Sequence, residues 1–474
     1  MNAHGYQYNL ASQRTLLGRT NSAVASWNGY VNALYDPAGQ LTHAWTYLPD
    51  GTPVTGVQWS YGYDAAQNLS KRTNNTTVET FTVNALNQLT AVPDSTPSYD
   101  RRGNLTQRYF PAGPQYYWTY TYDAENQLAS VATDPYYTYD TYRFKVEFTY
   151  DGQGRLRVKK DYTWASGIWN LASETRYVYD GMLIVQERNG SNTPTVTYTR
   201  GRDLSGSYAG TGGIGGLLAR SHGYSGGSWS THNFYHADGN GNVTALVNSA
   251  GTLQASYKYD PYGRYLSQSG ALASANVLRF SSKPWVGFNG SPTAGLYYYG
   301  YRFYDPYLQR WVNRDPAGEN ASLNLHAFNI NDPISFVDPF GLMTTDRWDY
   351  PPPPYKPPCY SRAEVDMAAR IAISGLLLRL RQLQALDDNN IDEWKRLQQR
   401  FKPVGRMGET YGISRPIDDW ENSLTSYALF FSAWPNAMYA GLSGDSLDVM
   451  KATTMSELIR QIAFLEWLAN VQIK

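Results

Sequence analysis

The segment Tyr150-Asp151-Gly-Gln-Gly154-Arg-Leu156 carries the pattern that decides the fold of this chain. Its Tyr favours the end of a β-strand, its Asp and Gly favour a tight turn, and its Leu favours the start of the next strand. The same form, Tyr-Asp-x-x-(Gly/Asn)-x-Leu, starts again at Tyr35, Tyr99 and Tyr122, and at Tyr63 with Gln67 in the Gly/Asn position. Each copy therefore predicts a β-hairpin.

Degenerate copies of this repeat start at Tyr8, Val83, Tyr179 and Tyr259, so the pattern occupies much of the chain. The spacing between most neighbouring copies leaves room for two strands. Because a single hairpin is marginally stable in water, the copies must support one another. We therefore expect a long antiparallel sheet.

The overall composition excludes several functional classes. Forty basic and forty acidic residues cancel, and no basic block is present, so nucleic acid is not expected as a partner. A single cysteine, Cys359, excludes a disulfide framework within the chain. No secretory signal is encoded at the start, and no apolar run is long enough to span a bilayer.

The segment Tyr297–Leu342 contains two Asp-Pro-x-Gly tetrapeptides, which start at Asp315 and Asp338. In each, Asp caps a type I turn, Pro presets the backbone and Gly tolerates the last position. The same tetrapeptide starts at Asp36 and Asp260, so by itself it predicts only a turn.

Together these features resemble the Tyr-Asp (YD) repeat family, and Tyr297–Leu342 resembles the core domain that closes Rhs proteins and the TcC subunits of insecticidal toxin complexes. Further matches are Gly212–Leu218 and Tyr235–Leu246. The resemblance implies a mainly β fold, in which residues 1–296 form an antiparallel β-sheet spiral or shell. Residues 297–342 would plug that shell, and a variable C-terminal domain, often a toxin, would follow.

The resemblance also implies chemistry, because family members are similar to aspartyl peptidases that cut themselves once. The catalytic residues would be Arg314, Asp315 and Asp338, and the cleaved bond would join Leu342 and Met343. Two neighbouring carboxylates share a proton, which leaves one as base for water and the other as acid for the carbonyl. An inward Arg314 would favour ionisation of one carboxylate. The open alternative is that these residues form ordinary turns and a surface ion pair.

Other polar residues of the core segment have simpler interpretations. Asp305 and Asp332 are expected in turns, and Arg302 and Arg310 are expected to pack on aromatic rings, although they could line the same site. His326 is expected to be buried and hydrogen-bonded rather than a proton shuttle.

Runs of tyrosine at Tyr116–Tyr120 and Tyr136–Tyr139 leave a carbohydrate site open as an alternative. Tyrosine is also simply a good strand residue, with a ring that covers a sheet and a hydroxyl that stays wet.

Beyond residue 342 the composition changes, and residues 343–360 form a Pro-rich linker. Residues 361–474 predict a small all-α domain, which starts with a capping box at Ser361–Glu364. This domain has no histidine, which excludes His-based nuclease, zinc deaminase and Cys-His protease mechanisms within it. Asp418, Asp419 and Glu421 could hold a metal but suit a solvated helix start better, so no metal or cofactor is predicted.

Three hypotheses follow for the function. The first is an Rhs-type shell that cleaves itself and releases a C-terminal effector. The second is a non-cleaving structural, adhesive or carbohydrate-binding surface protein. The third places an enzymatic or pore-forming toxic activity in residues 343–474, although the absence of a basic face argues against membrane binding.

The expected partners are the chain's own C-terminal domain, a secretion apparatus or toxin-complex subunit, an immunity protein and glycans. By family resemblance the protein would be secreted or on the cell surface.

Overall fold

The computed structural model describes residues 2–21, 28–93, 95–110, 116–134, 143–288, 291–318, 323–342 and 345–346. The chain divides into two compact units, Met1–Trp348 and Asp349–Lys474, and all of the described residues belong to the first. Met343, most of the predicted linker and the whole predicted helical domain lie outside the described residues.

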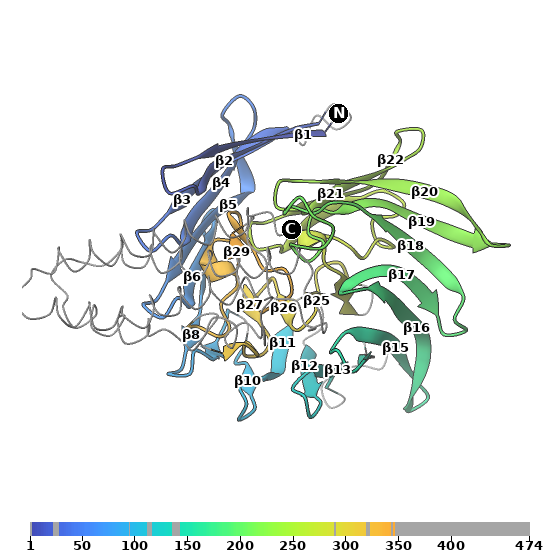
Figure 1. Ribbon diagram of the computed structural model, residues 1–474. Coiled ribbons are helices and arrows are strands. Elements are labelled where there is room, and N and C mark those ends of the chain that lie inside the picture. Colours follow the sequence, from blue (N-terminus) through green and yellow to red (C-terminus); the bar gives the residue numbers. More distant parts are fainter. Residues whose placement is uncertain are drawn as a thin grey trace, which may run out of the picture. The chain divides into compact units, whose positions relative to one another are not determined.

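The first unit is built from antiparallel strands that pair in chain order (Figure 1). One sheet has seven strands: β1 (Asn2–Tyr8), β2 (Arg14–Asn21), β3 (Gly29–Tyr35), β4 (Leu41–Tyr47), β5 (Pro53–Tyr63), β6 (Leu69–Asn74) and β7 (Thr77–Thr80).

The other large sheet has fourteen strands: β10 (Ser98–Tyr99), β11 (Leu105–Phe110), β12 (Tyr116–Tyr122), β13 (Leu128–Thr133), β14 (Phe144–Tyr150), β15 (Leu156–Ala165), β16 (Ile168–Asp180), β17 (Leu183–Asn189), β18 (Pro194–Arg200), β19 (Leu217–Ser225), β20 (Ser228–Ala237), β21 (Val243–Asn248), β22 (Leu253–Tyr259) and β23 (Tyr265–Ser269). The expected long antiparallel arrangement is confirmed.

Shorter elements complete the unit. A hairpin of β8 (Thr82–Val83) and β9 (Leu89–Ala91) comes between the two large sheets in the chain, and a four-stranded sheet, a second hairpin and two 3-10 turns follow them. These are η3 (Phe280–Ser282), β24 (Trp285–Gly287), β25 (Gly295–Tyr298), β26 (Phe303–Asp305), β27 (Arg310–Trp311), η6 (Asn329–Asn331), β28 (Phe336–Val337) and β29 (Thr345–Asp346).

The Tyr-Asp repeat forms the hairpin turns that its residues predict. In the copy at Tyr150, β14 ends at the Tyr and β15 begins at Leu156. Asp151 Oδ1 accepts hydrogen bonds from the backbone N–H groups of Gln153, at 3.0 Å, and Arg155, at 3.1 Å. Gly154 has a φ of +76°, a left-handed conformation that favours glycine. The repeat Asp therefore caps a turn.

The repeat Tyr joins each hairpin to the one before it. Tyr150 Oη donates to the backbone carbonyl of Leu128, the Leu of the preceding copy, at 2.6 Å. Phenylalanine could not form this bond, so this position of the repeat favours tyrosine. The same link joins Tyr63 to Leu41, Tyr122 to Leu105, Tyr179 to Leu156 and Tyr259 to Val243.

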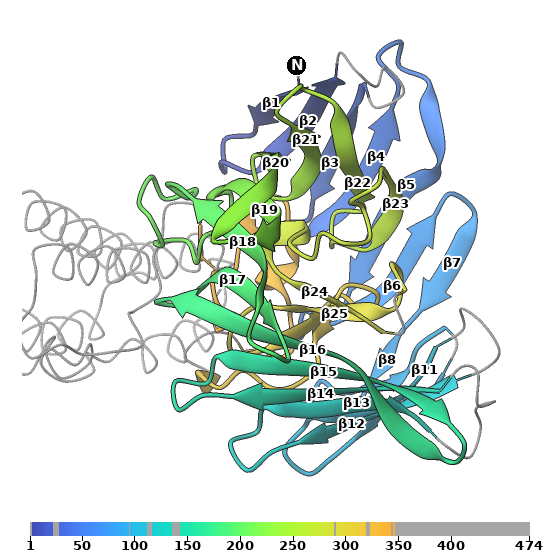
Figure 2. The same ribbon diagram turned by 90° about the vertical axis from the view of Figure 1, so that its right-hand side faces the viewer.

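The segment from β24 to β28 lies between the two large sheets and is bonded to both (Figures 1 and 2). In β6 of the smaller sheet, Arg72 Nη1 donates to the carbonyl of Tyr307 at 2.8 Å. In the larger sheet, Arg108 forms a buried ion pair with Asp305, and Leu156 N donates to Tyr298 Oη at 2.8 Å. These contacts fix the position of residues Tyr297–Leu342, which we call the core segment.

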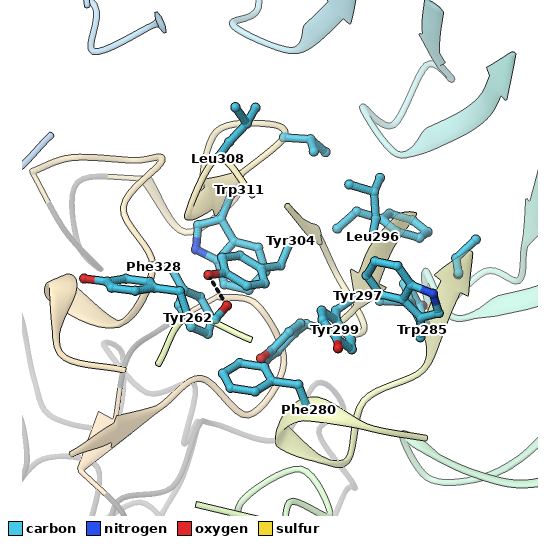
Figure 3. Packing of buried hydrophobic residues seen from close by; sticks show 14 of the residues in the cluster. Tyr262, Phe280, Trp285, Leu296, Tyr297, Tyr299, Tyr304, Leu308, Trp311 and Phe328 are labelled. Atoms are coloured by element: carbon cyan, nitrogen blue, oxygen red, sulfur yellow. Dashed lines mark hydrogen bonds between the residues drawn. The ribbon is translucent and has the colours of Figure 1, made fainter. Parts of the chain in front are cut away.

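Aromatic rings fill the core of this segment (Figure 3). Tyr304 stacks on Phe328 with ring centroids 3.9 Å apart, and Trp311 meets Tyr299 edge-on at 5.1 Å. Tyr304 Oη also donates to the carbonyl of Tyr262, which belongs to a repeat turn. The repeats and the core segment therefore share one hydrophobic core.

The two large sheets also meet through their turns. Arg14 Nη1 in β2 donates to Asn240 Oδ1 at 2.6 Å, and Gly239 N donates to Tyr6 Oη at 2.5 Å. The first strands of the smaller sheet therefore contact the turn between β20 and β21 of the larger one, as the views of Figures 1 and 2 also show.

Candidate active site

Asp315 lies in a turn that follows β27. Its Oδ1 accepts the N–H of Ala317 at 2.8 Å, and Gly318 N donates to the Asp315 carbonyl at 3.0 Å, as the tetrapeptide predicts. Its own N–H donates to the carbonyl of Leu325 at 3.0 Å. These bonds leave Oδ2 of the carboxylate available to other groups.

Asp338 lies in the second such turn, directly after β28. Its Oδ1 accepts three backbone N–H groups, from Phe340 at 3.1 Å, Gly341 at 2.6 Å and Leu342 at 3.2 Å. The Asp338 carboxylate is therefore hydrogen-bonded to Leu342, the first residue of the predicted cleavage bond. The other residue of that bond, Met343, lies outside the described residues.

Arg302 brings the two carboxylates together. Its Nη2 lies 2.7 Å from Asp315 Oδ2 and 3.6 Å from Asp338 Oδ2, and all three side chains are nearly inaccessible to solvent. Its Nε donates to the carbonyl of Gly341, and its Nη1 donates to the carbonyl of Leu325 at 3.1 Å. One arginine therefore holds both turns.

The family resemblance implies a different arginine, Arg314, as the one that acts on these two carboxylates. The side chain of Arg314 lies against Gly103, where an added Cβ would come within 2.5 Å of Nε. Among the described residues, the ion pairs of Asp315 and Asp338 are with Arg302. Arg302 was expected mainly to pack on a ring, and it does lie 4.2 Å from the centroid of Trp311.

Burial dominates the electrostatics of the pair. It raises the pKa of Asp315 to about 6, and the charge of Asp338 adds to this rise while Arg302 opposes it. Burial also raises the pKa of Asp338, against Arg302 and the three N–H donors. Two close carboxyls with raised pKa values are suited to share one proton near neutral pH.

A buried lysine that the sequence interpretation missed lies beside the pair. Lys283 Nζ donates to the carbonyls of Pro339 and Gly212. Burial lowers the pKa of Lys283 to about 7, and the negative charge of Asp338 opposes this shift. No motif surrounds Lys283 in the sequence, so only the fold reveals its proximity.

The remaining polar candidates lie away from the two carboxylates. Asp305 Oδ1 caps a turn, accepting the N–H of Tyr307 at 2.9 Å, and Asp332 Oδ1 accepts the N–H of Ser335 at 3.0 Å. Arg310 Nη2 donates to the carbonyl of Asn87 at 2.7 Å.

His326 is buried within the core segment. Burial lowers its pKa well below the ordinary value, so the ring is neutral, and it packs edge-on against Tyr99. Its backbone carbonyl accepts the N–H of Trp311 at 3.0 Å. Both ring nitrogens are buried without a hydrogen-bond partner among the described residues, so the expected burial is confirmed and the expected hydrogen bonding of the ring is wrong. A neutral ring does not suit a proton shuttle.

The tyrosine run of β12 follows the alternation of a strand. Trp118 and Tyr120 are buried in the hydrophobic core, so these members of the run do not line a sugar-binding surface. The run Tyr136–Tyr139 lies outside the described residues.

Neither a metal-binding group nor a membrane-spanning helix is found among the described residues. In that part of the chain, no group of three or more His, Cys, Asp or Glu side chains could hold a metal ion. None of the helices there is long and apolar enough to cross a membrane.

Comparison with known proteins identifies the repeats. The family model described as the teneurin YD-shell matches residues 19–166. The chain is 28% identical to the tRNA3(Ser)-specific nuclease WapA of Bacillus spizizenii over 306 residues, and 28% identical to the double-stranded DNA deaminase toxin A of Burkholderia cenocepacia over 326 residues. The chain is therefore similar to YD-shell proteins and to toxins of the WapA and Rhs type.

The chain matches only part of each relative. The alignments cover 62% of this chain and 11% of the WapA chain, and 67% of this chain and 21% of the deaminase toxin. Toxin subunit YenC1 of Yersinia entomophaga is 39% identical over 98 residues, which are 20% of this chain and 10% of the subunit. The solved Tc holotoxin pore of Photorhabdus luminescens superposes with a TM-score of 0.37 at 20% identity, over 73% of this chain and 19% of that chain.

Proposed function

We propose that this chain belongs to a toxin-delivery shell protein and that its core segment cuts the chain once, between Leu342 and Met343. The cut would separate the YD-repeat unit from residues 343–474, which would act as the effector. The observation that carries the proposal is the meeting of Asp315 and Asp338 on Arg302, with Asp338 bonded to the N–H of Leu342.

The proposed reaction needs one water molecule and the shared proton. The ionised carboxylate takes a proton from water, and the water oxygen adds to the carbonyl carbon of Leu342. The protonated carboxyl gives its proton to the carbonyl oxygen. The C–N bond to Met343 then breaks as the carboxyl that took the water proton passes it to the leaving nitrogen. The other carboxylate takes back a hydroxyl proton, so two chains result and the shared proton is restored.

In this scheme, Arg302 keeps the two carboxylates close and balances their negative charge. Its bond to the Gly341 carbonyl also ties it to the residue before Leu342. The three N–H donors on Asp338 Oδ1 fix the orientation of that carboxylate, leaving Oδ2 for proton transfer. Such positioning accounts for a large share of the rate of many intramolecular reactions.

The names of the relatives support a toxin context, in which a secretion apparatus, toxin-complex subunits and an immunity protein would be partners. The protein itself would act outside the producing cell or at its surface. YenC1 is named as a toxin subunit, and two other relatives are named as a nuclease and a deaminase toxin. The effector activity of residues 343–474 is open under this proposal.

A denaturing gel of freshly synthesised full-length chain tests the cut. Wild type should give two fragments, and Asp338→Asn should give one intact chain. Asp36→Asn is the matched control, because it changes the Asp of another Asp-Pro-x-Gly turn outside the core segment, and it should cut like wild type. An intact wild-type chain would favour the non-cleaving, adhesive alternative.

A further inference from the structure

The amine of Lys283 makes contacts that the proposed reaction does not use. It is buried, with the residue only 6% exposed, and it lies 5.4 Å from the ring centroid of Tyr299 and 5.6 Å from that of Phe340. Its two hydrogen bonds go to the carbonyls of Pro339 and Gly212. A buried amine is costly unless its donors are satisfied, so these bonds hold the two carbonyls firmly.

The second of these carbonyls belongs to a glycine loop with a defined shape. Asp203 Oδ2 accepts the N–H groups of Thr211, at 2.7 Å, and Gly213, at 3.1 Å, so the Gly210–Thr211 and Gly212–Gly213 peptides are fixed. Gly212 has a φ of +57°, and a Cβ there would lie 2.2 Å from the Pro339 carbonyl oxygen. The loop backbone therefore packs directly on the Asp338 turn.

The Pro339 carbonyl is connected to the carboxylate through one planar peptide. Its oxygen and the N–H of Phe340 belong to the same peptide group and point in opposite directions. Holding the oxygen on Lys283 therefore directs the Phe340 N–H toward Asp338 Oδ1, which accepts it at 3.1 Å.

We propose that Lys283, backed by the glycine loop Thr211–Gly213, is a positioning residue for self-cleavage: it holds the Pro339–Phe340 peptide and through it the Asp338 carboxylate. This inference rests on the proposed cut after Leu342. It gives the Gly-rich segment Gly212–Leu218 a role, since Gly212 allows the close approach that lets both carbonyls reach one amine.

The test follows the cutting rate of full-length chain made by cell-free synthesis and sampled on denaturing gels. Lys283→Met removes the donor at similar length, and we expect it to slow cutting about 100-fold, the loss typical of a misplaced catalytic group. Lys283→Arg keeps a donor and should cut about tenfold or more faster than Lys283→Met. Lys160→Met, at a partly exposed lysine of β15, should cut at the wild-type rate.

Folding is checked separately on the uncut Asp338→Asn background, where Lys283→Met should melt as one cooperative unit. If it does not fold, Gly212→Ala tests the same contact from the loop side and should also slow cutting. Wild-type rates in the folded Lys283→Met or Gly212→Ala chain, or no recovery in Lys283→Arg, would overturn the inference. An uncut wild type would instead refute the proposed function on which it rests.

Discussion

Replacing Arg302 with Met should destabilise the YD-repeat unit far more than replacing Arg314 with Met. Arg302 is 3% exposed and faces two buried carboxylates at 2.7 and 3.6 Å. Removing one partner of a buried ion pair leaves the other charge uncompensated and costs about 3–5 kcal/mol. Arg314 is partly exposed, and loss of a surface charge costs about 1 kcal/mol or less.

The Arg302 effect should depend on pH. The folded-state pKa of Asp315, about 6, already lies above the ordinary value of 3.8, and loss of Arg302 removes a charge that lowers it. The folded variant therefore binds a proton that the unfolded chain does not bind. The parent chain loses stability in the same way between the ordinary value and its own folded-state pKa. The penalty relative to the parent therefore grows above that folded-state pKa, by about 1.4 kcal/mol per pH unit, until the higher pKa of the variant is reached. The variant should be less destabilised at pH 5 than at pH 8.

The assay is urea unfolding followed by tryptophan fluorescence, with both arginine variants built on Asp338→Asn so that every chain stays uncut. On this background the ion pair that Arg302→Met breaks is the one with Asp315, at 2.7 Å. We expect a loss of about 3–5 kcal/mol for Arg302→Met at pH 8, and a smaller loss at pH 5. Equal effects of Arg302→Met and Arg314→Met, or an Arg302→Met effect that does not change between the two pH values, would refute this account of the site.

Three further predictions concern the turns and the repeat. Gly341→Ala should lower the melting temperature of the chain more than Gly318→Ala does, and it should slow cutting. Both glycines have positive φ, but of the two only Gly341 has neighbours that an added Cβ would meet, the closest at 3.2 Å. Equal effects would contradict it. Tyr150→Phe should cost about 1 kcal/mol in urea unfolding, because it removes the hydroxyl that donates to the Leu128 carbonyl. Burial raises the pKa of Asp332 to about 7, so the folded chain loses stability as pH rises from about 4 to 7. Asp332→Asn removes this titration and should reduce the change in melting temperature between pH 5 and 7.5.

The hairpin turns could be predicted because their causes are local. In Tyr150–Leu156, the capping Asp, the left-handed Gly154 and the strand ends all lie within one short segment. The degenerate copy at Tyr179 shows the limit of this reasoning. There β16 continues through Asp180, whose Oδ2 accepts a hydrogen bond from Tyr208, and the turn is shorter.

The hydrogen bonds between repeats and the arrangement of the site depend on contacts between residues that are far apart in the sequence. No local pattern encodes such contacts. The family resemblance named Asp315 and Asp338, but it could not show that the arginine between their carboxylates is Arg302. The resemblance also names Arg314, next to Asp315, yet the side chain of Arg314 packs against a repeat turn at Gly103. Lys283 lies 56 residues before Pro339 and has no motif around it.

The most direct test of the central claim is the intact mass of the purified protein under denaturing conditions. We predict two species for wild type, one that ends at Leu342 and one that begins at Met343, and a single full-length species for Asp338→Asn. A wild-type protein that has the mass of the complete chain, or one cut at a different bond, would contradict the account.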